Sequence, residues 1–145
     1  MTQQMTFQQS GNDAIKQRIT QIANKIKNKK PVLKRIGIKL LNEIDKSFQR
    51  GGNDKGTWAP DSPVTIARKG SSKVLVDTGL LRGSYIMKVG ADFVDVGTPV
   101  RYASAMQEGT KDIPARPMLP SKSKTLSITK DTLEKYIKEI ARAGT

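Results

Sequence analysis

Cysteine and histidine are both absent from this 145-residue chain, and each absence excludes a class of chemistry. Without cysteine there is no disulfide framework, no thiolate nucleophile and no cysteine-ligated metal, a composition that fits a reducing compartment. Without histidine, the commonest general base and the commonest metal ligand are missing. Aromatic residues make up 5% of the chain, which argues against the base-stacking platforms of single-strand nucleic-acid binders.

Long apolar runs are missing as well. None approaches the ~20 residues that a membrane-spanning helix needs, and residues 1–10 are rich in Gln and Thr without a signal-peptide core. We therefore expect a soluble protein that is made in the cytoplasm and has no membrane contact. A length of 145 residues with 36% hydrophobic content predicts a single domain with a modest core over residues 1–145.

Motifs of the common enzyme classes do not occur either. There is no phosphate-binding Gly-x-x-x-x-Gly-Lys-Ser/Thr loop, and no Gly-x-Gly-x-x-Gly follows a strand. Asp77, Asp92 and Asp95 are close in sequence, but nothing pairs them as an acid–base couple or a metal cage. We expect no catalytic, cofactor-binding or metal-binding residue, no cofactor and no enzymatic activity.

Positive charge is abundant and unevenly distributed. The net charge is +13, and nine bases face a single acid, Asp13, between residues 13 and 39. Such a field attracts nucleic acid or an acidic protein surface, and the attraction falls steeply with salt. The alternative is a helix face that is simply solvated. The candidates for facing a channel or DNA are Lys25, Lys27, Lys29, Lys30, Lys34 and Arg35.

Residues 12–50 have the apolar spacing of amphipathic helices, after a flexible N-terminus at residues 1–11. Pro31 interrupts the pattern and is suited to the first turn of a second helix, which ends at Gly51-Gly52. The spacing leaves open whether the two segments form one kinked helix or a helix pair. The apolar positions are Ile15, Ile19, Ile22 and Ile26 in the first segment, and Leu33, Ile36, Leu40, Ile44 and Phe48 in the second.

Residues 51–72 are rich in Gly, Pro, Ser, Asp and Asn, a composition typical of a long loop. Trp58 is the only large aromatic side chain in this segment. A tryptophan in a polar loop either anchors the loop to the core or contacts another subunit, because exposed tryptophans are enriched at interfaces.

Residues 73–120 are predicted to form a small antiparallel sheet with its loops. A first strand is expected at residues 73–77 and a hairpin at residues 84–97, with the turn at Gly90-Ala91-Asp92. Between them we expect a turn that is capped by the Thr78 hydroxyl and anchored by a leucine. A catalytic role for the hydroxyls of Thr78 and Ser84 is the alternative, but no base is recognisable beside them.

The rest of the chain is predicted to be a short helical turn at residues 101–107, a proline-stiffened loop and a helix. Arg116 lies between two prolines, so it either clamps carbonyl oxygens of its own chain or forms a salt bridge to a neighbouring subunit. Thr129 is the expected N-cap of a C-terminal helix within residues 121–145. The fold class is therefore α+β, with an N-terminal amphipathic helix or helix pair, a small antiparallel sheet with a central hairpin, and a C-terminal helix packed on the sheet.

Five short motifs occur in a fixed order between about Phe48 and Leu119. They are Trp58-Ala59-Pro60, the segment from Asp77 to Ser84, Val96-Gly97-Thr98, Tyr102-Ala103, and the segment from Ile113 to Leu119. In this order the chain resembles the phage virion morphogenesis family, the small tail-completion or neck proteins of long-tailed bacteriophages such as Mu-like phages. It departs from the family after Tyr102-Ala103, where a histidine is frequent and Ser104 stands here.

The resemblance implies a structural protein of the virion, made in the cytoplasm of a bacterial host. It implies a homo-oligomeric, sixfold ring at the head–tail junction that caps the tail and allows the head to join. The partners would be head-connector or adaptor proteins and tail tube or tail terminator proteins, with genomic DNA passing by. The alternatives are a basic DNA-binding protein and an assembly chaperone that is absent from the mature virion.

Two groups of residues follow from these motifs. The candidates for subunit or partner interfaces are Trp58, Arg82, Tyr102, Arg116 and Met118, and the hairpin at residues 84–97 is a candidate for extending a neighbour's sheet. The turn and core positions of the motifs are Thr78, Gly79, Leu81, Ser84, Pro114, Pro117 and Leu119, where the leucine of the first motif could also be Leu80.

Overall fold

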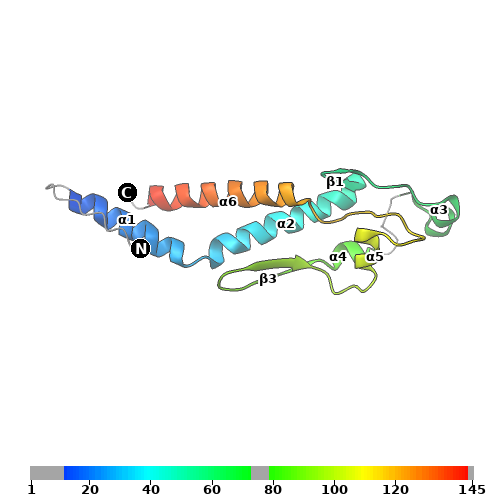
Figure 1. Ribbon diagram of the computed structural model, residues 1–145, viewed down its shortest axis with the longest axis horizontal. Coiled ribbons are helices and arrows are strands. Elements are labelled where there is room, and N and C mark those ends of the chain that lie inside the picture. Colours follow the sequence, from blue (N-terminus) through cyan, green and yellow to red (C-terminus); the bar gives the residue numbers. More distant parts are fainter. Residues whose placement is uncertain (1–11, 73–78, 144–145) are drawn as a thin grey trace.

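Three layers run side by side along an elongated molecule in the computed structural model, which describes residues 12–72 and 79–143 (Figure 1). Helix α2 (Lys30–Arg50) forms the middle layer. Helix α6 (Lys122–Ala143) packs along one side of it, and the hairpin of β3 (Ile86–Val89) and β4 (Val94–Gly97) packs on the other. The sequence predicted that the C-terminal helix packs on the sheet. In the structure α2 lies between α6 and the hairpin and packs against both.

The two N-terminal segments are separate helices, which settles the alternative that the sequence left open. Helix α1 (Asn12–Lys27) and α2 are divided by Asn28 and Lys29, and Pro31 occupies the first turn of α2 as predicted. Helix α2 ends at Gly51, whose φ of 75° lets its N–H bond to the carbonyl oxygen of Ser47. Helix α1 reaches the far end of α6, where the guanidinium of Arg18 donates to the carbonyl oxygen of Ala141.

Residues 51–72 are more structured than the predicted loop. Strands β1 (Gly52–Asn53) and β2 (Gly56–Thr57) pair antiparallel, and helix α3 spans Pro63–Lys69. The hydroxyl of Ser62 caps α3 by accepting a hydrogen bond from the N–H of Thr65. Two-residue strands and a seven-residue helix are too short to produce a periodic apolar pattern, so composition alone suggested a loop.

The predicted hairpin is present, with Met87 opposite Val96 and Val89 opposite Val94. It lies close to α2 at Gly37, where an added Cβ would come within 2.7 Å of the Met87 sulfur and 2.9 Å of Val94 Cγ2. A short helix, α4 (Leu80–Gly83), forms the turn before it, and α5 (Ala103–Glu108) confirms the predicted helical turn after it. The expected strand at residues 73–77, the cap Thr78 and the N-terminus at residues 1–11 lie outside the described residues.

Helix α6 begins two turns earlier than predicted. Its first turn is capped by Ser121, whose hydroxyl accepts a hydrogen bond from the N–H of Lys124 at 3.2 Å. Thr129 lies in the middle of the helix and donates its hydroxyl to the carbonyl oxygen of Thr125, so its predicted role as N-cap is wrong. Ser121 also binds the carboxylate of Asp54 from the β1–β2 turn, a partner that local sequence does not reveal.

The main core lies where the C-terminal half of α2 meets the motif segments. Phe48 is fully buried there, and its ring meets that of Trp58 edge-on at 5.6 Å. Such edge-to-face contacts stabilise aromatic pairs beyond the area they bury. The buried cluster consists of Ile44, Phe48, Trp58, Leu81, Ala103 and Met118.

Candidate functional site

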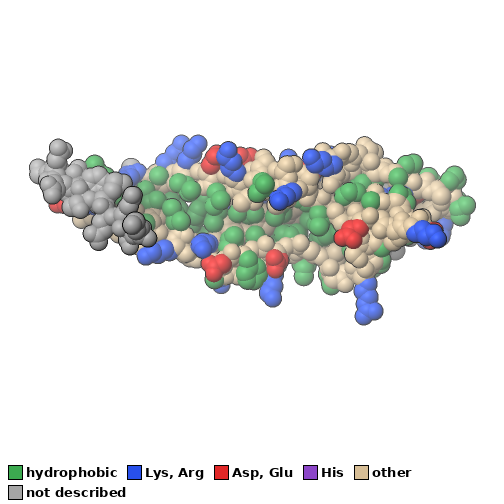
Figure 2. All heavy atoms as spheres, viewed as in Figure 1, with side chains coloured by type: hydrophobic (Ala, Val, Ile, Leu, Met, Phe, Trp, Pro, Cys, Tyr) green, Lys and Arg blue, Asp and Glu red, His purple; other side chains and the backbone are tan. Residues whose placement is uncertain are grey.

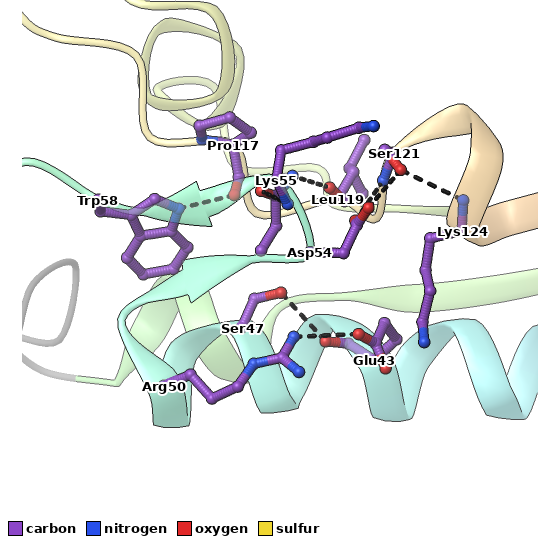
Figure 3. A network of polar contacts seen from close by, with 11 residues as sticks. Glu43, Ser47, Arg50, Asp54, Lys55, Trp58, Pro117, Leu119, Ser121 and Lys124 are labelled. Atoms are coloured by element: carbon purple, nitrogen blue, oxygen red, sulfur yellow. Dashed lines mark hydrogen bonds and ion pairs between the residues drawn. The ribbon is translucent and has the colours of Figure 1, made fainter.

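Trp58 connects two of the motifs that are far apart in the sequence. Its indole N–H donates a 2.7 Å hydrogen bond to the carbonyl oxygen of Pro117, and the side chain is 5% exposed (Figure 3). The tryptophan therefore anchors its loop to the core, as one of the two alternatives from the sequence predicted. A buried indole of this kind needs a polar partner, and the proline-rich segment supplies it.

Arg116 clamps the same loop from the other side. Its guanidinium donates to the carbonyl oxygens of Ala59 at 3.0 Å and Pro60 at 3.1 Å, and it lies 3.5 Å from the carboxylate of Asp61. Asp61 also forms a buried ion pair of 2.7 Å with Lys69 of α3. The side chain of Arg116 is thus engaged within its own chain, in the first of the two arrangements that its rigid backbone allowed.

The backbone of the segment around Arg116 is held on its opposite edge by α5. The N–H of Arg116 donates to the carbonyl oxygen of Met106, and the side-chain oxygen of Gln107 accepts from the N–H groups of Met118 and Leu119. Sequence analysis gave Gln107 no role. The only local signal for Gln107 was its place one turn after Ala103 in the predicted helical turn. Its hydrogen-bond partners, Met118 and Leu119, lie more than ten residues away in the sequence, so this signal did not reveal them.

The turn motif and the motif at residues 96–98 also meet. The hydroxyl of Ser84 donates to the carbonyl oxygen of Leu81 and lies 2.6 Å from the hydroxyl of Thr98. Gly79 has a φ of 81°, which favours glycine at the start of α4, and Leu81 is buried in the core. These residues therefore shape and anchor the turn, as the motif predicted.

Arg82 of α4 is paired with a carboxylate on α2. It forms two hydrogen bonds with the carboxylate of Asp45, from Nε at 2.7 Å and from the terminal nitrogen at 3.1 Å. These hydrogen bonds, together with the charge of Asp45, raise the pKa of the Arg82 guanidinium above its ordinary value. The paired geometry fixes the direction of α4 relative to α2.

A second polar network ties the β1–β2 hairpin to the start of α6 (Figure 3). Asn53 donates to the carbonyl oxygen of Leu119 at 3.0 Å, and Asp54 accepts from Ser121. Although desolvation alone would raise it, the pKa of Asp54 is lowered below its ordinary value by the hydrogen bonds from Ser121. On α2, Arg50 pairs with the buried carboxylate of Glu43 at 3.0 Å.

Burial separates the five predicted interface residues into two groups. Trp58, Arg116 and Met118 are at most 8% exposed, so their side chains stabilise the subunit, and the expectation that they contact a neighbour is not supported by their position. Arg82 is partly exposed but bound to Asp45. Tyr102, at 45% exposure, is the member of the set with a large accessible surface.

All six candidates for facing a channel or DNA have exposed side chains around the α1–α2 junction. Two of them are engaged within the chain: Lys29 pairs with Asp92 at the hairpin turn, and Arg35 pairs with Glu139 of α6 at 2.7 Å. The guanidinium of Arg35 also lies 5.2 Å from the centre of the Tyr136 ring. The four candidates outside these two ion pairs are Lys25, Lys27, Lys30 and Lys34.

Apolar side chains gather along the long axis of the molecule, over the helices and the hairpin (Figure 2). On α1, Ile15 and Ile19 are 55% and 53% exposed, although their spacing had suggested a buried stripe. Helix α6 has a second exposed stripe, in which seven and four residues separate the members, so that they share one face. It consists of Leu126, Leu133 and Ile137.

The model of the phage virion morphogenesis family matches residues 11–138, most of the chain. The chain belongs to this family. The family assignment gives the protein a role in the assembly of phage virions. The match covers all five motifs, α1, α2 and most of α6. No curated protein and no solved structure is significantly similar to the chain. None of the helices among the described residues is long and apolar enough to cross a membrane.

Proposed function

We propose that this member of the phage virion morphogenesis family is a structural component that self-associates into a ring at the head–tail junction. The ring caps the tail and offers the surface on which the head connector docks. Sixfold symmetry would match the tail tube. The partners in this proposal are head-connector or adaptor proteins on one side and tail tube or tail terminator proteins on the other.

The observation that carries the proposal is the amount of apolar surface on an elongated subunit. Exposed apolar stripes on two long helices, α1 and α6, are typical of surfaces that other molecules cover. A second copy of the chain covers such a surface when subunits associate around an axis.

The rigid motif region supports the same role. Trp58, Arg116 and Gln107 hold the loops together with hydrogen bonds between segments that are distant in sequence. Loops that are fixed before association lose little conformational entropy when a neighbour binds. The motif region therefore supplies a preformed end to the subunit, and the long helices supply the area for association.

The basic α1–α2 junction fits contact with passing DNA. Lys25, Lys27, Lys30 and Lys34 have exposed side chains and lie within a few residues of this junction. In a ring, a basic surface that lines the central opening attracts the phosphate backbone without reading its sequence. The same residues would carry the activity of a DNA-binding protein of another kind, so both functions must be tested together.

The test is the solution mass of the full chain, measured by light scattering after size exclusion at low and high salt. We expect a discrete oligomer that persists at high salt, because burial of apolar surface is not weakened by screening. The matched variants Leu133→Asp and Lys130→Asp change neighbouring exposed positions of α6, and only the former should reduce the mass. A monomer at both salts would contradict the ring. Tight binding of random duplex DNA near physiological salt by that monomer would instead support the DNA-binding alternative.

Recovery of the chain from purified virions separates a structural component from an assembly chaperone. We expect it in the finished particle at a fixed ratio to the tail proteins. Its presence during assembly and absence from the particle would favour the chaperone.

A further inference from the structure

An exposed phenylalanine occupies the tip of the β3–β4 hairpin. Phe93 is 46% exposed and lies in the tight turn Gly90–Phe93, which is closed by a 2.9 Å hydrogen bond from the N–H of Gly90 to the carbonyl oxygen of Phe93. We call this turn the hairpin tip. The phenyl ring lies directly over Gly90, so closely that a Cβ at residue 90 would overlap it. The absence of a side chain at Gly90 therefore leaves room for the ring to lie against the backbone of the turn.

The hairpin tip also carries acidic groups. Asp92 is part of the turn, with its side chain 77% exposed even though one oxygen binds Lys29 of the same chain. Asp95 follows on β4 and is exposed, with Lys88 as its neighbour across the hairpin. The exposed aromatic ring is thus flanked by two carboxylates in an otherwise basic protein.

A groove lined by apolar and basic side chains lies between α2 and α6. It has a volume of about 380 Å³, is predominantly apolar, and includes Ile38, which is 42% exposed. Three bases surround the isoleucine, Arg35 and Lys39 from α2 and Lys135 from α6, against one acid, Glu139. We call this the α2–α6 groove.

Arg35 lines the α2–α6 groove and is already engaged within the chain. The guanidinium of Arg35 is fixed by its ion pair with Glu139 and by its position over the ring of Tyr136. Lys39 and Lys135 form no ion pair within the described part of the chain, so their charges are available to carboxylates of another molecule. The groove therefore suits an apolar side chain that is accompanied by acidic groups.

We propose that the hairpin tip of one copy docks in the α2–α6 groove of the next copy. Phe93 would cover Ile38, while the carboxylates of Asp92 and Asp95 would face Lys39 and Lys135. Helix α2 lies between the hairpin and α6, so the tip reaches the groove of another molecule and not its own (Figure 1). The inference rests on the proposed self-association and adds to it a contact beside the exposed apolar stripes of α1 and α6.

The two surfaces are different and complementary, which is the arrangement that a head-to-tail ring requires. An interface between identical patches would stop at a dimer, whereas a tip-to-groove contact leaves one free tip and one free groove after each addition. Rotation around an axis then closes the ring. Ion pairs at the rim add specificity for the register more than affinity.

Sedimentation velocity of the full chain over a range of concentrations tests this contact. We expect Phe93→Ala to raise the dissociation constant of self-association at least about tenfold, as for an interface anchor. Gly90→Ala should have a similar effect, because it displaces the ring without removing it. The double variant Lys39→Glu/Lys135→Glu should weaken association from the groove side. Val64→Asp is the matched control, since Val64 is 79% exposed on α3 and is remote from both surfaces.

Mixing a tip variant with a groove variant tests the contact more sharply than either variant alone. The Phe93→Ala variant retains an intact groove, and the Lys39→Glu/Lys135→Glu variant retains an intact tip. Each should be monomeric alone, and an equimolar mixture should form a heterodimer that grows no further. Circular dichroism of each variant should match that of the parent, which excludes unfolding as the cause.

The possible failures are distinguishable. If the parent oligomerises and Phe93→Ala gives the same oligomer, the tip-to-groove contact is wrong and the proposed ring stands. If the groove variant alone loses association, the groove receives another segment and the role of the tip is overturned. A parent that remains monomeric at every concentration overturns both the contact and the self-association on which it rests.

Discussion

The indole N–H of Trp58 donates to the carbonyl oxygen of Pro117 over a sequence separation of 59 residues. This hydrogen bond joins a loop that follows α2 to the proline-rich segment that precedes α6. The two segments on either side of it are the motifs by which the chain resembles its family. Trp58, Arg116 and Met118 of these segments therefore belong to the inside of the subunit.

Replacing Trp58 tests this internal role. Trp58→Phe should lower the free energy of unfolding by about 1–3 kcal/mol, because it leaves the carbonyl oxygen of Pro117 unpaired. Trp58→Ala should cost about 3–5 kcal/mol through the cavity that it creates beside Phe48. Urea unfolding followed by far-UV circular dichroism measures both. Equal stability of the parent and Trp58→Ala would mean that the indole does not anchor the core.

Arg116→Lys should be destabilising although it keeps the charge. A lysine cannot donate in a planar fork to the carbonyl oxygens of Ala59 and Pro60, and we expect a loss of about 1.5–3 kcal/mol. Arg101→Lys is the matched control because Arg101 is exposed on the surface. In urea, Arg116→Lys should unfold at a lower concentration than Arg101→Lys. If the two unfolding curves coincide, the clamp contributes nothing to stability.

Gly37→Ala should loosen the hairpin. Alanine is the better helix former, but its Cβ would lie 2.7 Å from the Met87 sulfur and 2.9 Å from Val94 Cγ2. Such overpacking typically costs about 1–3 kcal/mol, which exceeds the gain in helix propensity of at most about 1 kcal/mol. Hydrogen exchange should therefore increase in β3 and β4 more than in α6. Shortening the obstructing side chain with Met87→Ala in the same molecule should restore part of the protection.

Tyr85 predicts a loss of stability at alkaline pH. Burial raises its pKa to about 12, whereas the phenol of an unfolded chain titrates near 10. Between these values the unfolded chain releases the proton first, so the free energy of unfolding falls as the pH rises from about 10 to about 12, and the contribution is intact below that window. Lysines titrate in the same range, and Tyr85→Phe separates their effect. The variant should show a shallower decline, and an identical decline would contradict the assignment to Tyr85.

Local sequence was sufficient for most of the elements. The apolar spacing of α2, the position of Pro31 in its first turn and the glycines at residues 51 and 52 predicted this helix and its bounds. Alternation and a short turn predicted the hairpin. In each case the signal lies within a few residues, because hydrogen bonds of helices and hairpins join near neighbours. The start of α6 was missed because its cap, Ser121, is supported by Asp54 from a distant turn.

The amino-acid sequence alone determined the α+β class, the absence of cysteine and histidine chemistry, the concentration of positive charge before residue 40, and the motif order that indicates the family. Only the tertiary structure decided that Trp58 and Arg116 point inward, that Ile15, Ile19 and Ile26 of α1 stay exposed, and that α2 and α6 enclose a basic-rimmed groove. The physical reason is the different sequence range of local and tertiary interactions. Helix propensity, caps and turns act over a few residues, whereas burial and pairing depend on which distant segments the folded chain brings together.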